Sequence, residues 1–211
     1  MESNVFKLSN AGGMSSRTRY WSMLAGNTTW VPFTPTGSFE SIATVTVGAG
    51  GASSISFSSI SGAYQHLQLR CLLKSTNAGS VLNAIYIQFN SDTGSNYSWH
   101  QVYGYNNAAG AGSGVSQSNM YPTYMPLSDS NVTNMFGGLV VDVLDYVDTN
   151  KYTTIRGLGG FDLNYAASYS GVIALGSGNW RNTAAVNAIT FSTTGGNFAQ
   201  YSQVSLYGVK A

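Results

Sequence analysis

The fold is decided by the stretch QHLQLRCLLK at residues 65–74. Apolar side chains alternate there with more polar ones, and the apolar set is Leu67, Leu69, Cys71 and Leu73. Alternation with a period of two is typical of a strand that has one buried face and one wetter face. We therefore expect a central strand with Cys71 on its core side.

The same pattern recurs along the chain and predicts about ten short strands, separated by small, turn-forming residues. The predicted strands are residues 42–47, 53–60, 65–75, 84–90, 97–105, 139–146, 152–158, 171–175, 185–193 and 203–209. Residues 106–135 are rich in Gly, Ala, Ser and Asn and are expected to form a long surface loop. The pattern favours an all-β domain over residues 36–211, namely a jelly-roll-like antiparallel β-sandwich.

Residues 1–35 differ, because they carry many large apolar side chains without strand alternation. Ser15 or Ser16 is a suitable cap for a short helix that runs to Leu24. One short helix cannot bury so many aromatic rings, so we expect an extended arm that docks on another chain or folds back on its own domain. The residues expected to dock are Phe6, Arg17, Arg19, Tyr20, Trp21 and Trp30.

The composition limits the classes of partner. Only 8% of the 211 residues are charged, against about 25% in an average protein, and the net charge is +1. This balance gives no case for nucleic acid as a partner, although Lys7, Arg17 and Arg19 oppose only Glu2 in the first 35 residues. Low charge suits surfaces that pack against other proteins.

The same sequence gives expectations about the cellular compartment. One cysteine excludes an intrachain disulfide, so folding does not need an oxidising compartment. The N-terminus has Glu2 near its start and lacks the apolar segment of roughly 7 to 15 residues that a signal peptide needs. No apolar run approaches the ~18 to 20 residues that span a bilayer. We expect synthesis in the cytoplasm and no membrane insertion.

The residues that catalysis requires are scarce. A nucleophilic site needs Ser or Cys beside a histidine base, and only His66 and His100 are available. His66 precedes a strand and is expected to be structural, while Cys71 is expected to be buried and unreactive. Zinc ligands at paired spacings and a phosphate-binding glycine loop are both missing. We therefore expect no enzymatic activity and no cofactor.

The polar run from Asn90 to Asn96 offers hard oxygen donors around a tight turn. Asn90, Asp92 and Asn96 could hold a hard cation such as calcium, but the run lacks the extra carboxylates and the terminal Glu of an EF-hand. Asn, Asp, Ser and Gly are also the residues that ordinary β-turns select. A polar turn is the simpler interpretation, and a cation loop is the alternative.

Three carboxylates follow one another at Asp142, Asp145 and Asp148. They could form a glycosidase pair or a cation site, but a glycosidase pair has to be held across a cleft, roughly 5 to 9.5 Å apart. The apolar residues around Asp142 instead indicate a strand that leaves a sheet. We expect loop acids that form ion pairs with Lys151 or Arg156.

Aromatic residues suggest a further type of site. The chain has fourteen tyrosines and four tryptophans, and rings presented by loops can stack on sugars. The candidate glycan contacts are Tyr103, Tyr105, Tyr121 and Tyr124. The alternative is that such rings belong to the core or the rim of a sandwich.

Several short motifs are distinctive in combination. They are YQHLQLR at 64–70, FNSDTGSNY at 89–97 with His100, DY at 145–146 leading to NKY at 150–152, GNWRNTAA at 178–185, NFAQYS at 197–202 and LYGVK at 206–210. With these motifs, residues 38 to 211 resemble structural proteins of tailed bacteriophages, especially marine and cyanobacterial phages. The resemblance assigns no catalytic residue.

The resemblance implies a non-enzymatic virion protein with a β-sandwich body, either a capsid decoration or a component of the tail or tail fibre. Its partners would be other virion proteins and further copies of itself, and the N-terminal arm, with Gly12-Gly13, would anchor it. The location would be the virion, after synthesis in the host cytoplasm. A carbohydrate-recognising receptor-binding module, which contacts host surface glycans, is the alternative function.

Overall fold

The structure is a computed structural model that describes residues 6–7, 20–22, 31–33, 38–78, 82–126, 134–163 and 171–210. The chain divides into two units, Met1–Ser38 and Phe39–Ala211. This boundary lies close to residue 36, where the sequence places the start of the domain. We call the two parts the N-terminal unit and the body.

The described backbone of the N-terminal unit is β-structure. β1 (Phe6–Lys7) and β3 (Val31–Phe33) both pair in antiparallel fashion with β2 (Tyr20–Ser22). The prediction of a helix that reaches Leu24 is therefore wrong at residues 20–22, which form a strand. Tyr and Trp favour the extended backbone, and β2 forms hydrogen bonds with a strand on each side. The rest of that expected helix lies outside the described residues.

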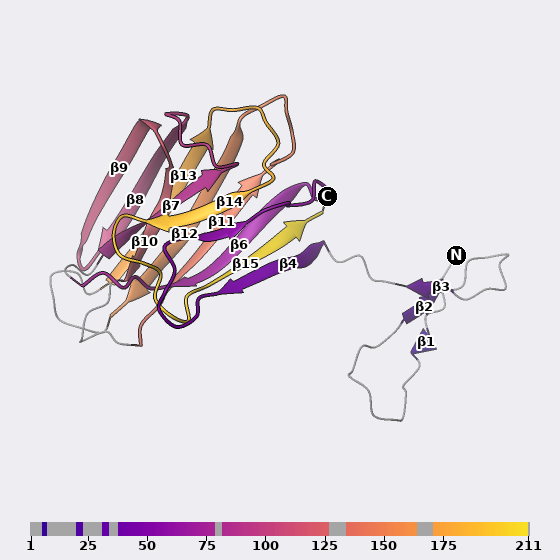
Figure 1. The fold of residues 1–211 in the computed structure, drawn as a ribbon, viewed down its shortest axis with the longest axis horizontal. Coiled ribbons are helices and arrows are strands. Elements are labelled where there is room, and N and C mark those ends of the chain that lie inside the picture. The colour runs from indigo at the N-terminus through magenta and orange to yellow at the C-terminus, as the bar shows by residue number, and fades with distance from the viewer. Residues whose placement is uncertain are drawn as a thin grey trace. The chain divides into compact units, whose positions relative to one another are not determined.

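In the residues that the structure describes, the body consists of strands, which confirms the expected all-β class (Figure 1). The strands are β4 (Phe39–Thr46), β5 (Ile55–Phe57), β6 (His66–Leu73), β7 (Leu82–Phe89), β8 (Tyr97–Tyr105), β9 (Ala108–Gln117), β10 (Met120–Pro126), β11 (Gly137–Leu144), β12 (Thr153–Asp162), β13 (Gly171–Trp180), β14 (Ile189–Thr193) and β15 (Gln203–Val209). All ten predicted strands overlap one of these.

The described strands of the body form two antiparallel sheets. The larger sheet has eight strands in the order β4-β15-β6-β11-β12-β13-β8-β9, and the smaller sheet has four in the order β10-β7-β14-β5. Within them, β4-β15-β6-β11 and β5-β14-β7-β10 have the neighbour order of a jelly roll built from two Greek keys. The pairs β12–β13 and β8–β9 extend the larger sheet beyond β11. We call β4, β15, β6 and β11 the jelly-roll half, and the other four strands the extension.

The main core lies between the two sheets. Leu67, Leu69 and Leu73 of β6, in the larger sheet, are completely buried. Phe89 of β7, in the smaller sheet, belongs to the same buried cluster. Removal of such apolar surface from water is the main favourable contribution to folding. Cys71 belongs to this cluster, which confirms its expected place on the core side.

The expectation of a long loop over residues 106–135 is wrong for β9 and β10. β9 consists mainly of Gly, Ala and Ser, which have little intrinsic preference for a strand. Rings of the neighbouring β8 compensate, because Tyr103 is the direct partner of Gly110 and Trp99 that of Gly114. A Cβ at either glycine would collide with the partner ring. Rings that cover glycines in this way stabilise weak strands.

β10 contains two of the prolines, Pro122 and Pro126. Pro122 lies within β10, which is an edge strand of the smaller sheet, and edge strands tolerate the missing N–H group. β10 also comes close to the extension. A Cβ added to Gly176 would lie 2.5 Å from the carbonyl oxygen of Pro122, and one added to Gly178 would lie 2.8 Å from the sulfur of Met120. Glycines of β13 therefore allow the backbones of the two sheets to approach each other.

Candidate functional site

The four tyrosines expected to contact glycans come together between β8 and β10. Tyr103 and Tyr105 lie on β8, and Tyr121 and Tyr124 lie on β10, so all four are on strands and not in loops. The ring centroids are 5.9 Å apart for Tyr103 and Tyr105, 5.7 Å for Tyr103 and Tyr124, and 5.0 Å for Tyr121 and Tyr124. We call this set the tyrosine cluster.

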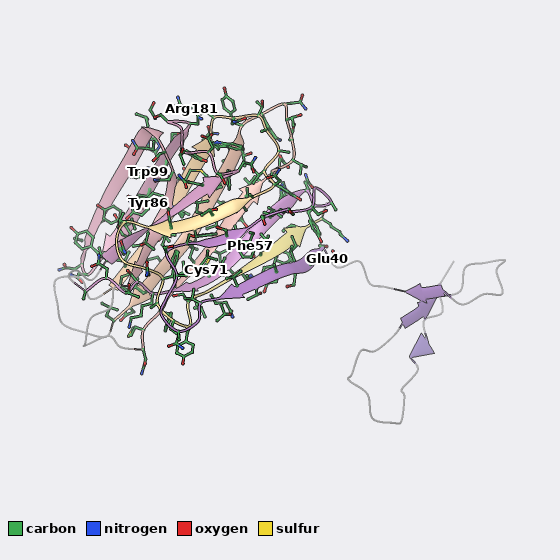
Figure 2. All side chains as sticks on the ribbon, viewed as in Figure 1. Glu40, Phe57, Cys71, Tyr86, Trp99 and Arg181 are labelled. Carbon is green, nitrogen blue, oxygen red and sulfur yellow. The ribbon has the colours of Figure 1, made fainter. Side chains whose placement is uncertain are left out.

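Two aromatic residues that the sequence reasoning missed extend the cluster. Trp99 of β8 and Tyr86 of β7 both pack edge-on against Tyr121, with centroids 5.1 and 5.9 Å away (Figure 2). The alternation of β8 places Trp99 on the same face as Tyr103. A period-two reading of residues 97–105 was therefore the signal that could have identified it.

Polar atoms are buried inside the same cluster. Nε2 of Gln101 donates to the hydroxyl of Tyr124 at 3.2 Å, but Oε1 of Gln101 has no hydrogen-bond partner although the residue is only 5% exposed. The hydroxyl of Thr123 is also buried without a partner. Buried polar atoms are nearly always paired, so these two atoms stand out as acceptors that no protein group uses.

The rings of the cluster also serve packing. Burial, together with the hydrogen bond to Tyr124, raises the pKa of Tyr121, so its phenol stays protonated. Tyr103, Tyr105 and Tyr124 keep part of their surface exposed while they pack on a second apolar cluster, which includes Phe161. Partly exposed rings beside amide and hydroxyl groups have the chemistry of sugar recognition. The core interpretation and the glycan interpretation thus apply to the same residues.

The loop from Asn90 to Asn96 joins β7 to β8 through a tight turn. Asn90 and Ser91 have φ values of 49° and 57°, and the N–H of Asp92 donates to the carbonyl of Phe89 at 2.9 Å. Two consecutive left-handed residues correspond to a type I′ turn, in which Asn is favoured. The local sequence therefore suits a sharp turn, which here carries the chain from β7 of the smaller sheet to β8 of the larger sheet.

Asp92 connects this loop to the rest of the body. Its Oδ2 accepts the indole N–H of Trp180 at 2.8 Å and Nδ2 of Asn96 at 2.9 Å, and its Oδ1 accepts the N–H of Gly94 at 2.8 Å. The bond from Trp180 is the main cause of the lowered pKa of Asp92. Such charge-assisted bonds hold the end of β13 against the β7–β8 turn.

The donors expected to hold a cation are therefore engaged with the protein. Oδ1 of Asn90 accepts the N–H groups of Asn187 and Ala188, just as the oxygens of Asp92 accept three bonds. Among the described residues, no group of three His, Cys, Asp or Glu side chains converges to hold a metal ion. This geometry favours the polar turn, and cation binding at Asn90, Asp92 and Asn96 stays a prediction.

The three neighbouring carboxylates form ion pairs, as the sequence indicates. Nε of Arg156 lies 2.8 Å from Asp142, and Nζ of Lys151 lies 2.5 Å from Asp145 and 3.4 Å from Asp148. The hydrogen bond from Lys151 is the main cause of the lowered pKa of Asp145. The expected pairing with Lys151 and Arg156 is confirmed, and it gives these acids a structural use at the end of β11.

The two histidines and the cysteine lie in different settings. Nδ1 of His66 accepts the N–H of Asp145 at 2.9 Å, so this imidazole holds the turn that follows β11. His100 is exposed on β8. Cys71 lies inside the body, and burial raises the pKa of its thiol (Figure 2). The structural use expected for His66 and the burial expected for Cys71 agree with this arrangement.

The residues expected to dock on a partner lie in the N-terminal unit. Three of them have backbones in β1 and β2, although their side chains are outside the described part: Phe6, Tyr20 and Trp21. The other three lie outside the described residues: Arg17, Arg19 and Trp30. Docking through this set stays a prediction.

Comparisons with known proteins identify no relative. No family model matches the chain, and neither a curated protein nor a solved structure matches it. Within the described ranges, the structure has no helix with the length and apolar character needed to cross a membrane.

Proposed function

We propose that this chain is a non-enzymatic structural protein of a bacteriophage virion, attached to the capsid or tail through its N-terminal unit and displaying the β-sandwich body. The observation that carries the proposal is the division of the chain into two units. The main core cluster runs from Val47 to Leu206 and lies wholly within the body. A self-contained body joined to a small separate unit supports a role in which one part attaches and the other is displayed.

The chemistry of the body suits the same role. The acids beside β11 are neutralised by ion pairs, His66 holds a turn, and the thiol of Cys71 is buried. The low content of charged residues reduces the desolvation cost of packing against other proteins. In a particle with many copies, avidity multiplies individually weak contacts.

Incorporation into particles tests the proposal. A tagged full-length chain should co-purify with phage particles and appear as defined density in electron micrographs of them, at a position that also distinguishes head from tail. A variant that lacks residues 1–38 should fold, as judged by circular dichroism, and be absent from particles. Full-length chain carrying Tyr152→Ala, an exposed residue of the body, is the control and should be incorporated normally.

Two results would contradict different parts of the proposal. Absence of the full-length chain from purified particles would contradict the virion role. Incorporation of the shortened chain at the normal level would contradict attachment through the N-terminal unit while leaving the virion role intact.

A second function, recognition of host surface carbohydrate by a receptor-binding module, is favoured by the tyrosine cluster. Four rings from two strands converge beside Gln101, whose buried Oε1 is unpaired. Sugars present apolar ring faces for stacking and hydroxyl groups that would donate to such an oxygen.

Glycan binding by the full-length chain tests this second function. Tyr105→Ala and Tyr124→Ala should each weaken binding on a glycan array by about tenfold, since loss of one ring contact of this kind amounts to ~1 kcal/mol or more. Tyr152→Ala, which removes an exposed tyrosine outside the cluster, should bind like the parent chain. No glycan signal for the parent chain, or an equal loss with Tyr152→Ala, would argue against a site at the cluster.

A further inference from the structure

The outer face of the larger sheet, which is turned away from the smaller sheet, carries two adjacent rows of apolar residues. In the apolar row, residues on neighbouring strands are direct partners in the order Val140, Leu158, Leu175, Val102 and Ala111. The glycine row lies beside it and has the order Leu72, Gly138, Gly160, Ile173, Gly104 and Ala109. We call the two rows together the outer patch.

The large side chains of the outer patch are exposed. Leu158 is 54% exposed, Leu175 is 52% exposed and Ile173 is 64% exposed. Two rows of residues cover about 13 Å along strands that lie about 4.8 Å apart, so five strands give the patch an area of about 300 Å². The largest apolar patch on a soluble monomer is typically about 300 to 600 Å² and often has a function. The outer patch therefore has the size of such a functional patch.

The shape of the patch is complementary to itself. Leu72 and Ile173 project from the glycine row, and two glycines separate them. Shallow hollows lie beside these projections; one is lined in part by Leu72 and Gly138, and another in part by Gly160 and Ile173. A face that alternates projections with glycine-floored hollows can interdigitate with a copy of itself.

Charges lie around the patch and cancel one another. Arg70 is the partner of Val140 at one end of the apolar row, the Asp142–Arg156 ion pair lies one row away, and Asp162 ends β12. Two positive and two negative groups leave the face neutral, so a second copy of it meets no net repulsion. From β11 to β8 the apolar row has the residue order Val, Leu, Leu, Val, which is the same in both directions. A two-fold axis can therefore place these four residues opposite the same four residues of a second copy.

We propose that the outer patch binds the outer patch of a second copy of this chain in an isologous, two-fold contact. The polar strands of the jelly-roll half would form the rim, and the whole outer face would then bury roughly 800 to 1,000 Å² per copy, which is the size of a standard stable interface. The contact needs neither the N-terminal unit nor a virion. If the dimer contact is disproved, the proposed function is unaffected. If the proposed function is disproved, the dimer contact is likewise unaffected.

The oligomeric state of the full-length chain tests the proposal. Sedimentation velocity should find a dimer at micromolar concentration. Leu158→Glu and Leu175→Glu each place opposed carboxylates in the contact and should raise the dimer dissociation constant by at least about a hundredfold. Both side chains are half-exposed, so the circular dichroism spectrum should match that of the parent chain, and the unfolding midpoint should fall only by the contribution of the lost dimer contact. Tyr152→Glu alters a similarly exposed residue six positions before Leu158 and should remain dimeric.

Proximity across the interface gives a second measurement. A full-length Ile173→Cys variant should be joined into covalent dimers by a short thiol-specific cross-linker, whereas the parent chain, whose Cys71 is buried, should not. Adding Leu158→Glu should abolish the cross-link. If Leu158→Ser replaces Leu158→Glu to avoid any effect of charge on folding, the dimer should still be weakened and the cross-link reduced.

Three outcomes would overturn the proposal. The parent chain would be monomeric at the highest soluble concentration, or it would form dimers that persist in both Glu variants, which would place the contact elsewhere. Alternatively, Trp21→Ala in the N-terminal unit would dissociate the dimer as strongly as Leu158→Glu does. That third result would mean that the N-terminal unit, and not a second outer patch, covers this face.

Discussion

The two halves of the larger sheet use their inner and outer faces differently. In β6 of the jelly-roll half, inward Leu69 is completely buried and outward Arg70 is exposed. In β13 of the extension, inward Gly176 has no side chain and outward Leu175 is 52% exposed. The first half follows the ordinary pattern of a sandwich, with large side chains inside, whereas at this point of the second half the larger side chain is on the outside.

The reversal has a physical cause on the inner side. The backbone of β10 lies close to β12 and β13, so a large inward side chain at Gly157 or Gly176 would collide with Pro122. The tyrosine cluster fills the remaining inner space next to β8. The outward leucines of the extension therefore contribute little to the core, and their exposed surface is the basis of the proposed contact with a second copy. Truncation of a core side chain should therefore lower the free energy of unfolding most in the jelly-roll half. Addition of a methyl group should lower it most at the inward glycines of the extension.

The largest expected effect is on the jelly-roll half. Leu69→Ala should lower the free energy of unfolding by about 2 to 5 kcal/mol, because it removes a completely buried side chain and leaves a cavity. Leu72→Ala on the same strand, where the side chain is 55% exposed, should cost less than about 1 kcal/mol. Urea unfolding would measure both, and comparable losses would break the assignment of the two faces.

The next effect belongs to the extension. Gly176→Ala should destabilise the body by about 1 to 3 kcal/mol, because its Cβ would lie 2.5 Å from the carbonyl oxygen of Pro122. Gly138→Ala is the matched control, since an added Cβ there meets nothing within 4 Å, and its effect should stay within about 0.5 kcal/mol. Equal unfolding midpoints for the two variants would refute close packing of β10 on the extension.

A smaller effect concerns the joint between the halves, where Asp92 holds Trp180 at the end of β13. The folded-state pKa of Asp92 is lower than its ordinary value of 3.8, chiefly through the Trp180 bond, so the ionised form stabilises the fold. This stabilisation is complete above the ordinary pKa and is lost as pH falls through the lower folded-state value. Asp92→Asn should cost about 1 to 2 kcal/mol near neutral pH and should flatten the acid side of the stability profile.

Unfolding measured from pH 7 down to pH 2 checks this expectation. Asp148→Asn is the comparison, because the pKa of Asp148 is also lowered, but chiefly by bonds from Asn150 in its own turn, so this variant removes a local carboxylate without loosening the end of β13. An unchanged acid profile in Asp92→Asn would mean that the Trp180 bond does not couple the fold to pH.

The smallest effect lies on the polar outer side of the jelly-roll half. The guanidinium of Arg70 lies 5.3 Å from the ring centre of Phe39 and 5.4 Å from that of Tyr207. Arg70→Gln should lower stability by about 0.5 to 1 kcal/mol, as expected for an exposed cation–π contact, and Arg70→Lys should lose less. Thermal unfolding resolves the difference, and identical losses in the two variants would assign the effect to the shape of the side chain and not to its charge.

Strands with strong alternation could be predicted from the sequence because the period-two pattern is local. β8 and β15 have the predicted bounds, residues 97–105 and 203–209, and Cys71 faces the core as expected. β9 could not be predicted, since its glycines form a strand only when Trp99 and Tyr103 cover them from the next strand. Such compensation depends on pairing, which no local pattern of residues 106–117 reveals.

The candidate sites divide in the same way. Tyr103 and Tyr121 are visible as aromatic residues in the sequence, but their convergence requires β10 to pair with β7 and to pack against β8. The outer patch is harder to predict from the sequence, because Leu158 and Leu175 become neighbours only through the register of β12 with β13. A shift of one residue in that register would turn either side chain to the other face.

Residue patterns along the chain are enough to predict the all-β class, the positions of the alternating strands, and the ion pairs of acids with Lys151 and Arg156. These features depend on residues that are close along the chain. The jelly-roll order, the formation of an edge strand by a glycine-rich stretch, and the exposure of one apolar sheet face become visible only in the folded molecule. Those depend on which strands pair and in which register, and strand pairing is set by contacts between residues far apart in the sequence.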